Sequence, residues 1–120
     1  LDLTVSHDRN PVFVLLSDGS VRNGYEIKIF NMLPQPRKFT LSIDGFPDAV
    51  MKLAGAVSQP TRQLAVSVAP DQLRSIKVFV RRPRRAIQSQ RQHFEFILKQ
   101  IDGDESERVT ARFEAPEISR

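Results

Sequence analysis

Residues 18–31 have the sequence DGSVRNGYEIKIFN, which joins a predicted hairpin turn to a predicted β-strand. Asp18 and Gly19 indicate the turn, because the central residues of tight hairpins adopt positive φ, which these residue types tolerate. After the turn, apolar and polar residues alternate, so one face of the strand is expected in the core and the other in water. The apolar face carries Tyr25, Ile27 and Ile29, and the polar face carries Glu26 and Lys28. The segment therefore predicts one long strand of an antiparallel sheet.

The same alternation recurs along the chain in short runs separated by Pro, Gly or Asp, a pattern typical of consecutive short strands. Pro34 and Pro36 predict a loop over residues 33–37, because proline cannot donate to a strand ladder. Each predicted strand has one apolar face, and two antiparallel sheets packed together would bury all of these faces. The predicted strands cover residues 3–5, 12–16, 21–30, 38–43, 50–53, 63–68, 76–80, 94–99 and 108–113.

These patterns predict an all-β fold, an immunoglobulin-like β-sandwich of two antiparallel sheets with seven to nine strands. The length of 120 residues suits a single domain over residues 1–120, and a start at Leu1 rather than Met indicates a fragment of a longer protein. Cys and Trp are absent, so apolar packing must replace the disulfide and the tryptophan of antibody domains. The expected core consists of Tyr25, Ile27, Ile29, Phe39, Leu41, Ile43, Leu64, Val66, Ile76, Val78, Val80, Phe94, Phe96, Leu98, Val109 and Phe113.

Enzyme chemistry is not expected of this chain. It contains no Gly-x-Ser-x-Gly elbow, P-loop or dinucleotide-binding fingerprint. Its two histidines, His7 and His93, are both expected on the surface, which leaves no base for nucleophilic catalysis. The absence of cysteine excludes disulfide, zinc–thiolate and iron–sulfur sites, and no apolar run reaches the length of a membrane span, so the isolated domain is expected to be soluble. We predict no catalytic or cofactor-binding residue.

Two groups of side chains belong to the types that bind metals. Clustered carboxylates can bind calcium, but Gly103 occupies the wrong place for an EF-hand loop, and we interpret the cluster as a charged, solvated hairpin tip. Copper takes thioether and imidazole ligands, but the candidates lack Met-x-x-Met or His-x-His spacing, so we predict no metal site. The carboxylates are Asp102, Asp104, Glu105 and Glu107, and the copper candidates are Met32, Met51, His7 and His93.

The net charge of +4 and the pI near 10.0 come from an excess of arginine. Arg81, Arg82, Arg84, Arg85 and Arg91 stand close together, between two predicted strands. Such a run is expected to form a solvated loop, and it could alternatively bind an anionic partner such as a nucleic acid or a lipid headgroup. The four arginines from 81 to 85 are therefore the candidate partner-binding residues.

Two stretches resemble a known family. They are RNPVF at residues 9–13 and DGSVRNGY at residues 18–25, followed by Lys28, Ile29 and Asn31. They are similar to the C-terminal part of the FixG/CcoG family, accessory proteins for the assembly of cbb-type cytochrome c oxidase. The resemblance implies a parent protein in the bacterial inner membrane, with several transmembrane helices and a ferredoxin-like region that holds two four-iron clusters. It also implies a redox role in copper reduction or delivery, with cupric reductase as the candidate activity.

For this domain, the resemblance implies a non-catalytic interaction module on the periplasmic side, tethered to the membrane by the rest of the protein. Because the cluster ligands are cysteines, no cofactor residue carries over to this chain. The expected partners are proteins, namely an oxidase subunit, a copper carrier or the parent's own membrane region, and no nucleic acid is expected. The alternative is an anion-binding module that acts through the loop from Arg81 to Arg85.

Overall fold

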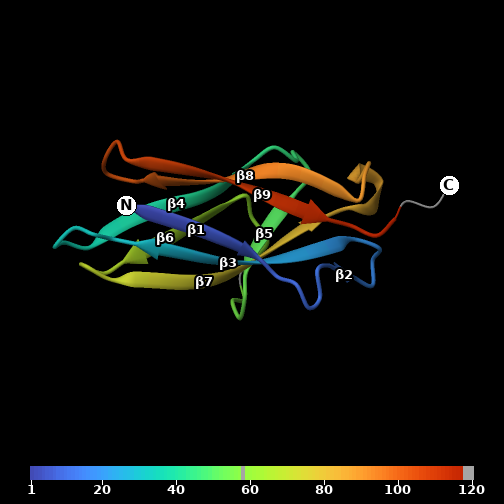
Figure 1. Ribbon diagram of the computed structural model, residues 1–120, viewed down its shortest axis with the longest axis horizontal. Coiled ribbons are helices and arrows are strands. Elements are labelled where there is room, and N and C mark those ends of the chain that lie inside the picture. The colour runs from blue at the N-terminus through green and yellow to red at the C-terminus, as the bar shows by residue number, and fades with distance from the viewer. Residues whose placement is uncertain (58, 118–120) are drawn as a thin grey trace.

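The computed structural model describes residues 1–57 and 59–117. Within these residues the chain forms nine strands and one short 3₁₀ helix (Figure 1). The strands are β1 (Asp2–His7), β2 (Val14–Leu15), β3 (Val21–Phe30), β4 (Arg37–Asp44), β5 (Val50–Leu53), β6 (Gln63–Val68), β7 (Leu73–Arg82), β8 (Arg91–Gln100) and β9 (Ser106–Glu114), and the helix is η1 (Arg84–Ala86). The predicted all-β fold with seven to nine strands is confirmed.

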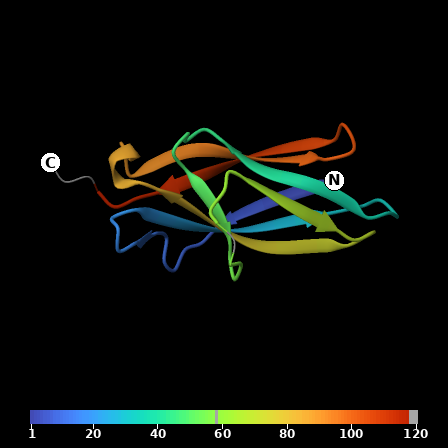
Figure 2. The ribbon, with the colours of Figure 1, turned by 180° about the vertical axis from the view of Figure 1, so that it is seen from behind.

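Two antiparallel sheets pack against each other in an elongated body of 54 × 25 × 24 Å (Figures 1 and 2). The first sheet has the order β1-β3-β7-β5, with β2 also paired to β3, and the second has the order β6-β4-β8-β9. Strand β3 therefore lies at the centre of the first sheet, where it pairs along its length with β7. This position explains why its alternation is so regular, since its inward face is covered by the second sheet and its outward face meets water.

The predicted hairpin at Asp18 and Gly19 is present. Strands β2 and β3 pair antiparallel, with Leu15 opposite Val21. Gly19 has φ of 88°, which glycine adopts without steric cost, and Asp18 accepts a hydrogen bond of 2.9 Å from the amide of Ser20. The strand before the turn is Val14–Leu15, shorter than the predicted residues 12–16. It ends before Leu16, whose carbonyl accepts the turn hydrogen bond from Gly19.

The predicted core residues are buried except for Leu64 and Val109, which are only half-buried. Both belong to edge strands of the second sheet, where no further strand covers one flank of the side chain. Burial also extends beyond the predicted set, into the connection that follows β4 and into the inward positions at strand ends. The additional buried apolar residues are Val21, Phe46, Ala49, Met51, Val68, Ala111 and Ala115.

Arg62, in the connection between β5 and β6, ties down the connection that follows β4. Its guanidinium donates hydrogen bonds of 2.7 Å to the carbonyls of Phe46 and Ala49. It also donates longer bonds to the carbonyls of Ile43 and Gly45, at 3.2 and 3.3 Å. One side chain thus supplies partners for four backbone carbonyls.

Replacing Arg62 with lysine is expected to lower the free energy of unfolding by about 1–2 kcal/mol, because a compact ammonium group cannot span four carbonyls as the planar guanidinium does. The effect would be measured by urea denaturation of the wild-type and variant chains. The matched control is Arg84→Lys, at an exposed position of η1, which should change stability by less than about 0.5 kcal/mol. Equal stability of Arg62→Lys and wild type would contradict the role of this contact.

Candidate functional site

The arginines predicted to form one solvated loop are separated by the structure. Arg81 and Arg82 end strand β7, and their side chains point to opposite faces of the sheet, as successive residues of a strand do. Arg84 and Arg85 are exposed in η1. Arg82 is only 4% exposed, which corrects the expectation that it lies in a solvated loop. Partner binding by Arg81, Arg84 and Arg85 stays a prediction.

The buried Arg82 lies between aromatic rings of the core. Its guanidinium carbon is 3.6 Å from the ring centre of Phe46 and 5.4 Å from that of Phe113, distances at which a cation is attracted to an aromatic face. Its Nη2 donates a 3.0 Å hydrogen bond to the carbonyl of Ala86. Burial lowers the pKa of Arg82, and the nearby carboxylate of Asp48 opposes this shift. Arg82 therefore closes one end of the core.

A small basic cleft lies on the outer face of the first sheet. Arg22 and Arg81 stand directly opposite each other on β3 and β7, and Lys52 of β5 stands opposite Phe79. The guanidinium of Arg22 lies 4.2 Å from the ring centre of Phe79. The cleft has a volume of about 160 Å³, and Leu16, Val50, Met51 and Pro60 complete its lining. Sequence reasoning identified Arg81 but not Arg22, because the two residues are far apart in the chain.

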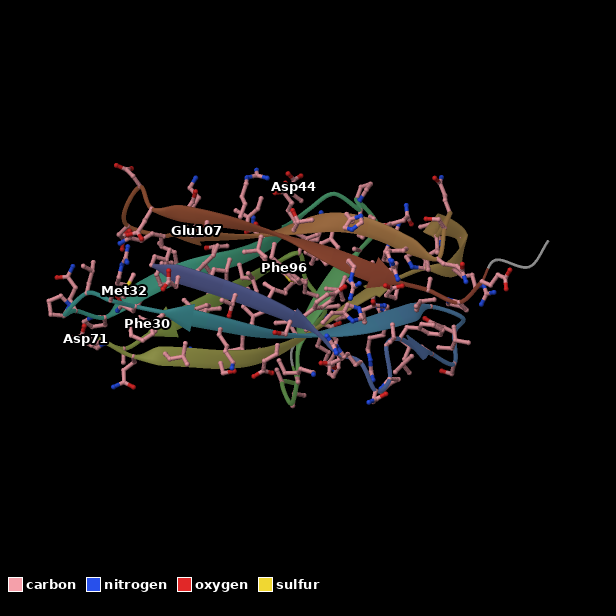
Figure 3. All side chains as sticks on the ribbon, viewed as in Figure 1. Phe30, Met32, Asp44, Asp71, Phe96 and Glu107 are labelled. Carbon is pink, nitrogen blue, oxygen red and sulfur yellow. The ribbon has the colours of Figure 1, made fainter. Side chains whose placement is uncertain are left out.

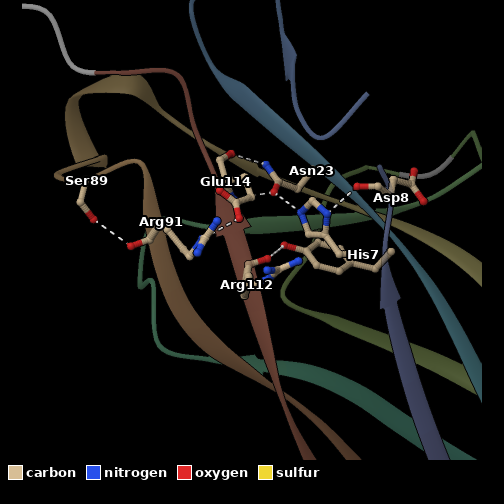
Figure 4. A network of polar contacts seen from close by, with 8 residues as sticks. His7, Asp8, Asn23, Ser89, Arg91, Arg112 and Glu114 are labelled. Atoms are coloured by element: carbon tan, nitrogen blue, oxygen red, sulfur yellow. Dashed lines mark hydrogen bonds and ion pairs between the residues drawn. The ribbon is translucent and has the colours of Figure 1, made fainter. Parts of the chain in front are cut away.

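A polar network joins the two sheets near the end of β1 (Figure 4). Asn23, 1% exposed, donates a 2.8 Å hydrogen bond to the carbonyl of Glu114 and accepts one of 2.8 Å from the amide of the same residue. His7 Nε2 lies 2.6 Å from Asn23 Oδ1. Tyr25 donates a 2.5 Å hydrogen bond to the carbonyl of Arg112, and burial raises its pKa far above the ordinary value. These contacts connect β1 and β3 of the first sheet to β9 of the second.

The two histidines differ from each other in the structure. His93 is exposed on β8, as predicted, whereas His7 is half-buried in the polar network and packs edge-on against Tyr25 with ring centres 5.0 Å apart. The prediction of a surface position for His7 is therefore wrong. The reason is that His7 occupies an inward position of β1 opposite Tyr25, where its ring nitrogens have polar partners in Asn23 Oδ1 and the carbonyl of Asp8.

The structure also locates the side chains that were considered as metal ligands. Met51 is buried in the core, and Met32 is exposed in the connection after β3. In the acidic hairpin tip, Glu105 forms an ion pair of 2.6 Å with the buried Arg37, which lowers the pKa of the Glu105 carboxyl. Over residues 1–57 and 59–117, no three His, Asp or Glu side chains gather in a way that could hold a metal ion.

An apolar surface lies at the end of the sandwich where β3 ends and β7 begins. Figure 3 shows Phe30, Met32 and Asp71 together at this end. Among the described residues, five of the eight exposed large apolar side chains belong to elements that meet here, with exposures from 37% to 52%. We call this surface the apolar end, and its residues are Phe30, Met32, Leu33, Leu73 and Ile101.

Strand pairing and hydrogen bonds hold the segments of the apolar end in place. Phe30 pairs with Leu73 across β3 and β7, and the amide of Ile101 donates a 3.0 Å hydrogen bond to the carbonyl of Lys38. Asn31, fully buried, donates to the carbonyls of three residues and accepts a 3.1 Å hydrogen bond from the amide of Leu33. The apolar side chains are therefore presented on an ordered frame.

The start of the chain lies at the same end. Asp2 in β1 pairs with Phe30 in β3, and both ribbon views place the N-terminus toward the turns that bear the apolar end (Figures 1 and 2). Across the described part of the chain, no helix combines the length and the apolar character that crossing a bilayer requires. Any chain that precedes residue 1 would leave the sandwich beside the apolar end.

Two known proteins align with most of the chain. The chain is 40% identical over 116 residues to the nitrogen fixation protein FixG of Rhizobium meliloti, which covers 97% of this chain and 22% of FixG. It is 36% identical over 84 residues to protein RdxA of Cereibacter sphaeroides, which covers 70% of this chain and 17% of RdxA. The chain thus spans only about a fifth of the length of these relatives.

A solved structure shares the fold. The crystal structure of a FixG-related protein from Vibrio parahaemolyticus superimposes with a TM-score of 0.78 at 20% sequence identity, covering 94% of each chain. The family model described as "IG-like fold at C-terminal of FixG, putative oxidoreductase" matches residues 1–116. The resemblance stated from residues 9–31 is confirmed, and so is the immunoglobulin-like character of the sandwich. This chain belongs to the family of immunoglobulin-like domains at the C-terminal end of FixG proteins.

Proposed function

We propose that this chain is a non-catalytic interaction domain that docks through its apolar end onto the preceding part of its own protein. The observation that carries the proposal is the coincidence of the apolar end with the start of the chain, because Asp2 pairs with Phe30. The family places this fold at the C-terminal end of FixG, so the remaining four-fifths of such a protein would enter the sandwich at this point.

Exposed apolar side chains on a rigid frame favour an interface with another apolar surface, from which water is excluded. Burying apolar surface contributes about 25 cal/mol per Å², and little conformational entropy is lost when the loops are already ordered. Leu33 is held by the buried Asn31, and Leu73 by its pairing with Phe30. A neighbouring region of the same polypeptide gains further from its high effective concentration.

For the parent protein, we propose a redox protein of the bacterial inner membrane that carries two four-iron clusters outside this chain. It would support the assembly of cbb-type cytochrome c oxidase through copper reduction or delivery, with this domain on the periplasmic side. The support is the family membership together with the word oxidoreductase in the family's description. Because this chain contains no cysteine, cluster ligation must lie in the preceding part of the protein.

The docking proposal is tested in the full-length protein by the triple variant Leu33→Ser, Leu73→Ser and Ile101→Ser. Removing three apolar side chains from the proposed interface should weaken docking by about 3 kcal/mol, seen as faster hydrogen exchange at the residues around them and at least a tenfold loss of assembled cbb-type oxidase. The matched control is Val12→Ser with Leu15→Ser, two exposed apolar residues elsewhere in the fold, which should change neither readout.

Three outcomes decide between the partners. Oxidase assembly at wild-type level in the triple variant would contradict the function of the apolar end. If oxidase assembly is lost while hydrogen exchange is unchanged, the apolar end would bind an oxidase subunit or a copper carrier instead. That result would contradict docking within the protein. Removing residues 1–116 from the full-length protein should impair assembly while both clusters still form, and normal assembly after this deletion would contradict the accessory role.

A further inference from the structure

We propose that the basic cleft on the outer face of the first sheet binds an acidic segment of a partner polypeptide. One carboxylate would lie between Arg22 and Arg81, and an adjacent apolar side chain would pack beside Phe79. The inference rests on the proposed function as an interaction domain, but it uses a surface separate from the apolar end.

Two like charges lie directly opposite each other in the cleft. Arg22 and Arg81 are cross-strand partners in the β3–β7 ladder, and like charges at directly opposite positions of a sheet destabilise it. Lys52, opposite Phe79, adds a third cation beside them. A carboxylate placed between the two guanidinium groups would convert this repulsion into two charge-assisted hydrogen-bonding interactions.

The lining of the cleft supplies no compensating negative charge. Its lining has no Asp or Glu, and over the described residues none of Arg22, Arg81 and Lys52 forms an ion pair within 4.0 Å. The nearby carboxyl of Asp18 has a lowered pKa mainly because it accepts the amide hydrogen bond of Ser20, and Arg81 contributes only in part. Asp18 is not part of the lining, so it offsets the charge of Arg81 only from outside the cleft.

Arg22 is held in place before any ligand binds. The guanidinium of Arg22 rests over the ring of Phe79 at 4.2 Å, which restricts the side chain through a cation–π contact. Arginine presents its donors in a rigid planar fork that matches a carboxylate. Binding would therefore cost less side-chain entropy than binding by freely moving lysines.

The size and surroundings of the cleft favour a peptide over a larger polyanion. A volume of about 160 Å³ with apolar walls from Leu16, Val50 and Pro60 suits one or two side chains. Farther along the same face the positive charge is interrupted before Lys28, because Lys77 pairs with Asp8 and the carboxylate of Glu26 lies between. A nucleic acid backbone or an anionic membrane needs a continuous basic surface instead.

The test uses the full-length protein in nanodiscs of phosphatidylcholine and a fluorescein-labelled peptide of three Glu-Leu repeats, followed by fluorescence anisotropy. The variant Arg22→Gln with Arg81→Gln is expected to weaken binding at least tenfold. The matched control, Arg84→Gln with Arg85→Gln, removes the same charge from η1 and should change the affinity less than twofold. A Gln-Leu peptide should bind at least tenfold more weakly than the Glu-Leu peptide.

A charge reversal keeps the test decisive even if the paired variant loses stability. The double reversal Arg22→Glu with Arg81→Glu is expected to bind a peptide of three Lys-Leu repeats more tightly than the wild type does, and failure to do so would count against the site. Equal losses in the two paired variants, equal binding of the Glu and Gln peptides, or no binding at low salt would overturn it. So would stronger binding to inorganic phosphate or to phosphatidylglycerol vesicles than to the peptide.

The apolar-end triple variant separates this inference from the proposed function. It should leave the affinity for the Glu-Leu peptide unchanged, because none of its three residues lines the cleft. Loss of peptide binding in that variant would overturn the cleft as an independent site. If this variant loses oxidase assembly and the wild-type protein binds the peptide only weakly, the cleft proposal would be wrong and the docking proposal would still hold.

Discussion

Replacing Asn23 with alanine is expected to lower the free energy of unfolding by about 3 kcal/mol, one of the two largest effects of a single substitution that we predict. Asn23 is buried in β3 and forms two hydrogen bonds with the backbone of Glu114 in β9. Alanine would leave the amide and the carbonyl of Glu114 without these partners in a region closed to water. It would also leave His7 without its contact to Asn23 Oδ1.

Urea denaturation followed by circular dichroism would measure this loss. The matched control is Gln88→Ala, which removes an amide side chain from an exposed position and should change stability by less than about 0.5 kcal/mol. Hydrogen exchange at the amide of Glu114 should accelerate in Asn23→Ala and not in the control. A loss below about 1 kcal/mol, with unchanged exchange, would show that the network does not hold the two sheets together.

Replacing Arg82 with serine is expected to have a comparable effect, about 3 kcal/mol of lost stability. The substitution would remove the guanidinium from between the rings of Phe46 and Phe113 and leave a cavity at that end of the core. It would also leave the carbonyl of Ala86 and the side chain of Gln92 without the hydrogen bonds that Arg82 donates.

The matched control for Arg82→Ser is Arg84→Ser, which removes the same charge from an exposed residue two positions later. Thermal denaturation of the two variants would compare them, and the control should unfold within about 1–2 °C of the wild type. Equal losses in both variants would mean that net charge, rather than packing, is responsible. Any test of anion binding by Arg81, Arg84 and Arg85 should leave Arg82 in place, because replacing Arg82 would lower stability as well as charge.

Much of the fold could be predicted from short-range patterns in the amino-acid sequence. The alternation at Tyr25, Ile27 and Ile29, the turn at Asp18 and Gly19, and the proline-rich loop all have local causes, namely side-chain periodicity and permitted φ values. The order of the strands in the two sheets could not be read this way. Pairing of β3 with β7 depends on contacts across more than forty residues, and alternation alone does not specify the partner of a strand.

The polar residues of the interior show where the sequence pattern was misleading. Asn23, Arg37 and Arg82 continue the inward periodicity of their strands, so the alternation did place them on the buried face. Their polarity nevertheless indicated a surface position. Within the predicted strand 21–30 the inward register includes Asn23, but Arg37 and Arg82 lie one and two residues outside the predicted strands 38–43 and 76–80, so those strands would also have had to be lengthened.

The amino-acid sequence is enough to predict that this chain forms alternating strands, that these strands need two sheets to bury their apolar faces, and that residues 9–31 resemble FixG. Which polar side chains are buried and which cations lie together depends on the three-dimensional arrangement of the strands. Asn23 is stable inside because β9 supplies its partners, and Arg22 meets Arg81 because β3 pairs with β7. The physical reason is that the cost of burying a polar group depends on partners brought from distant strands, which local periodicity does not encode.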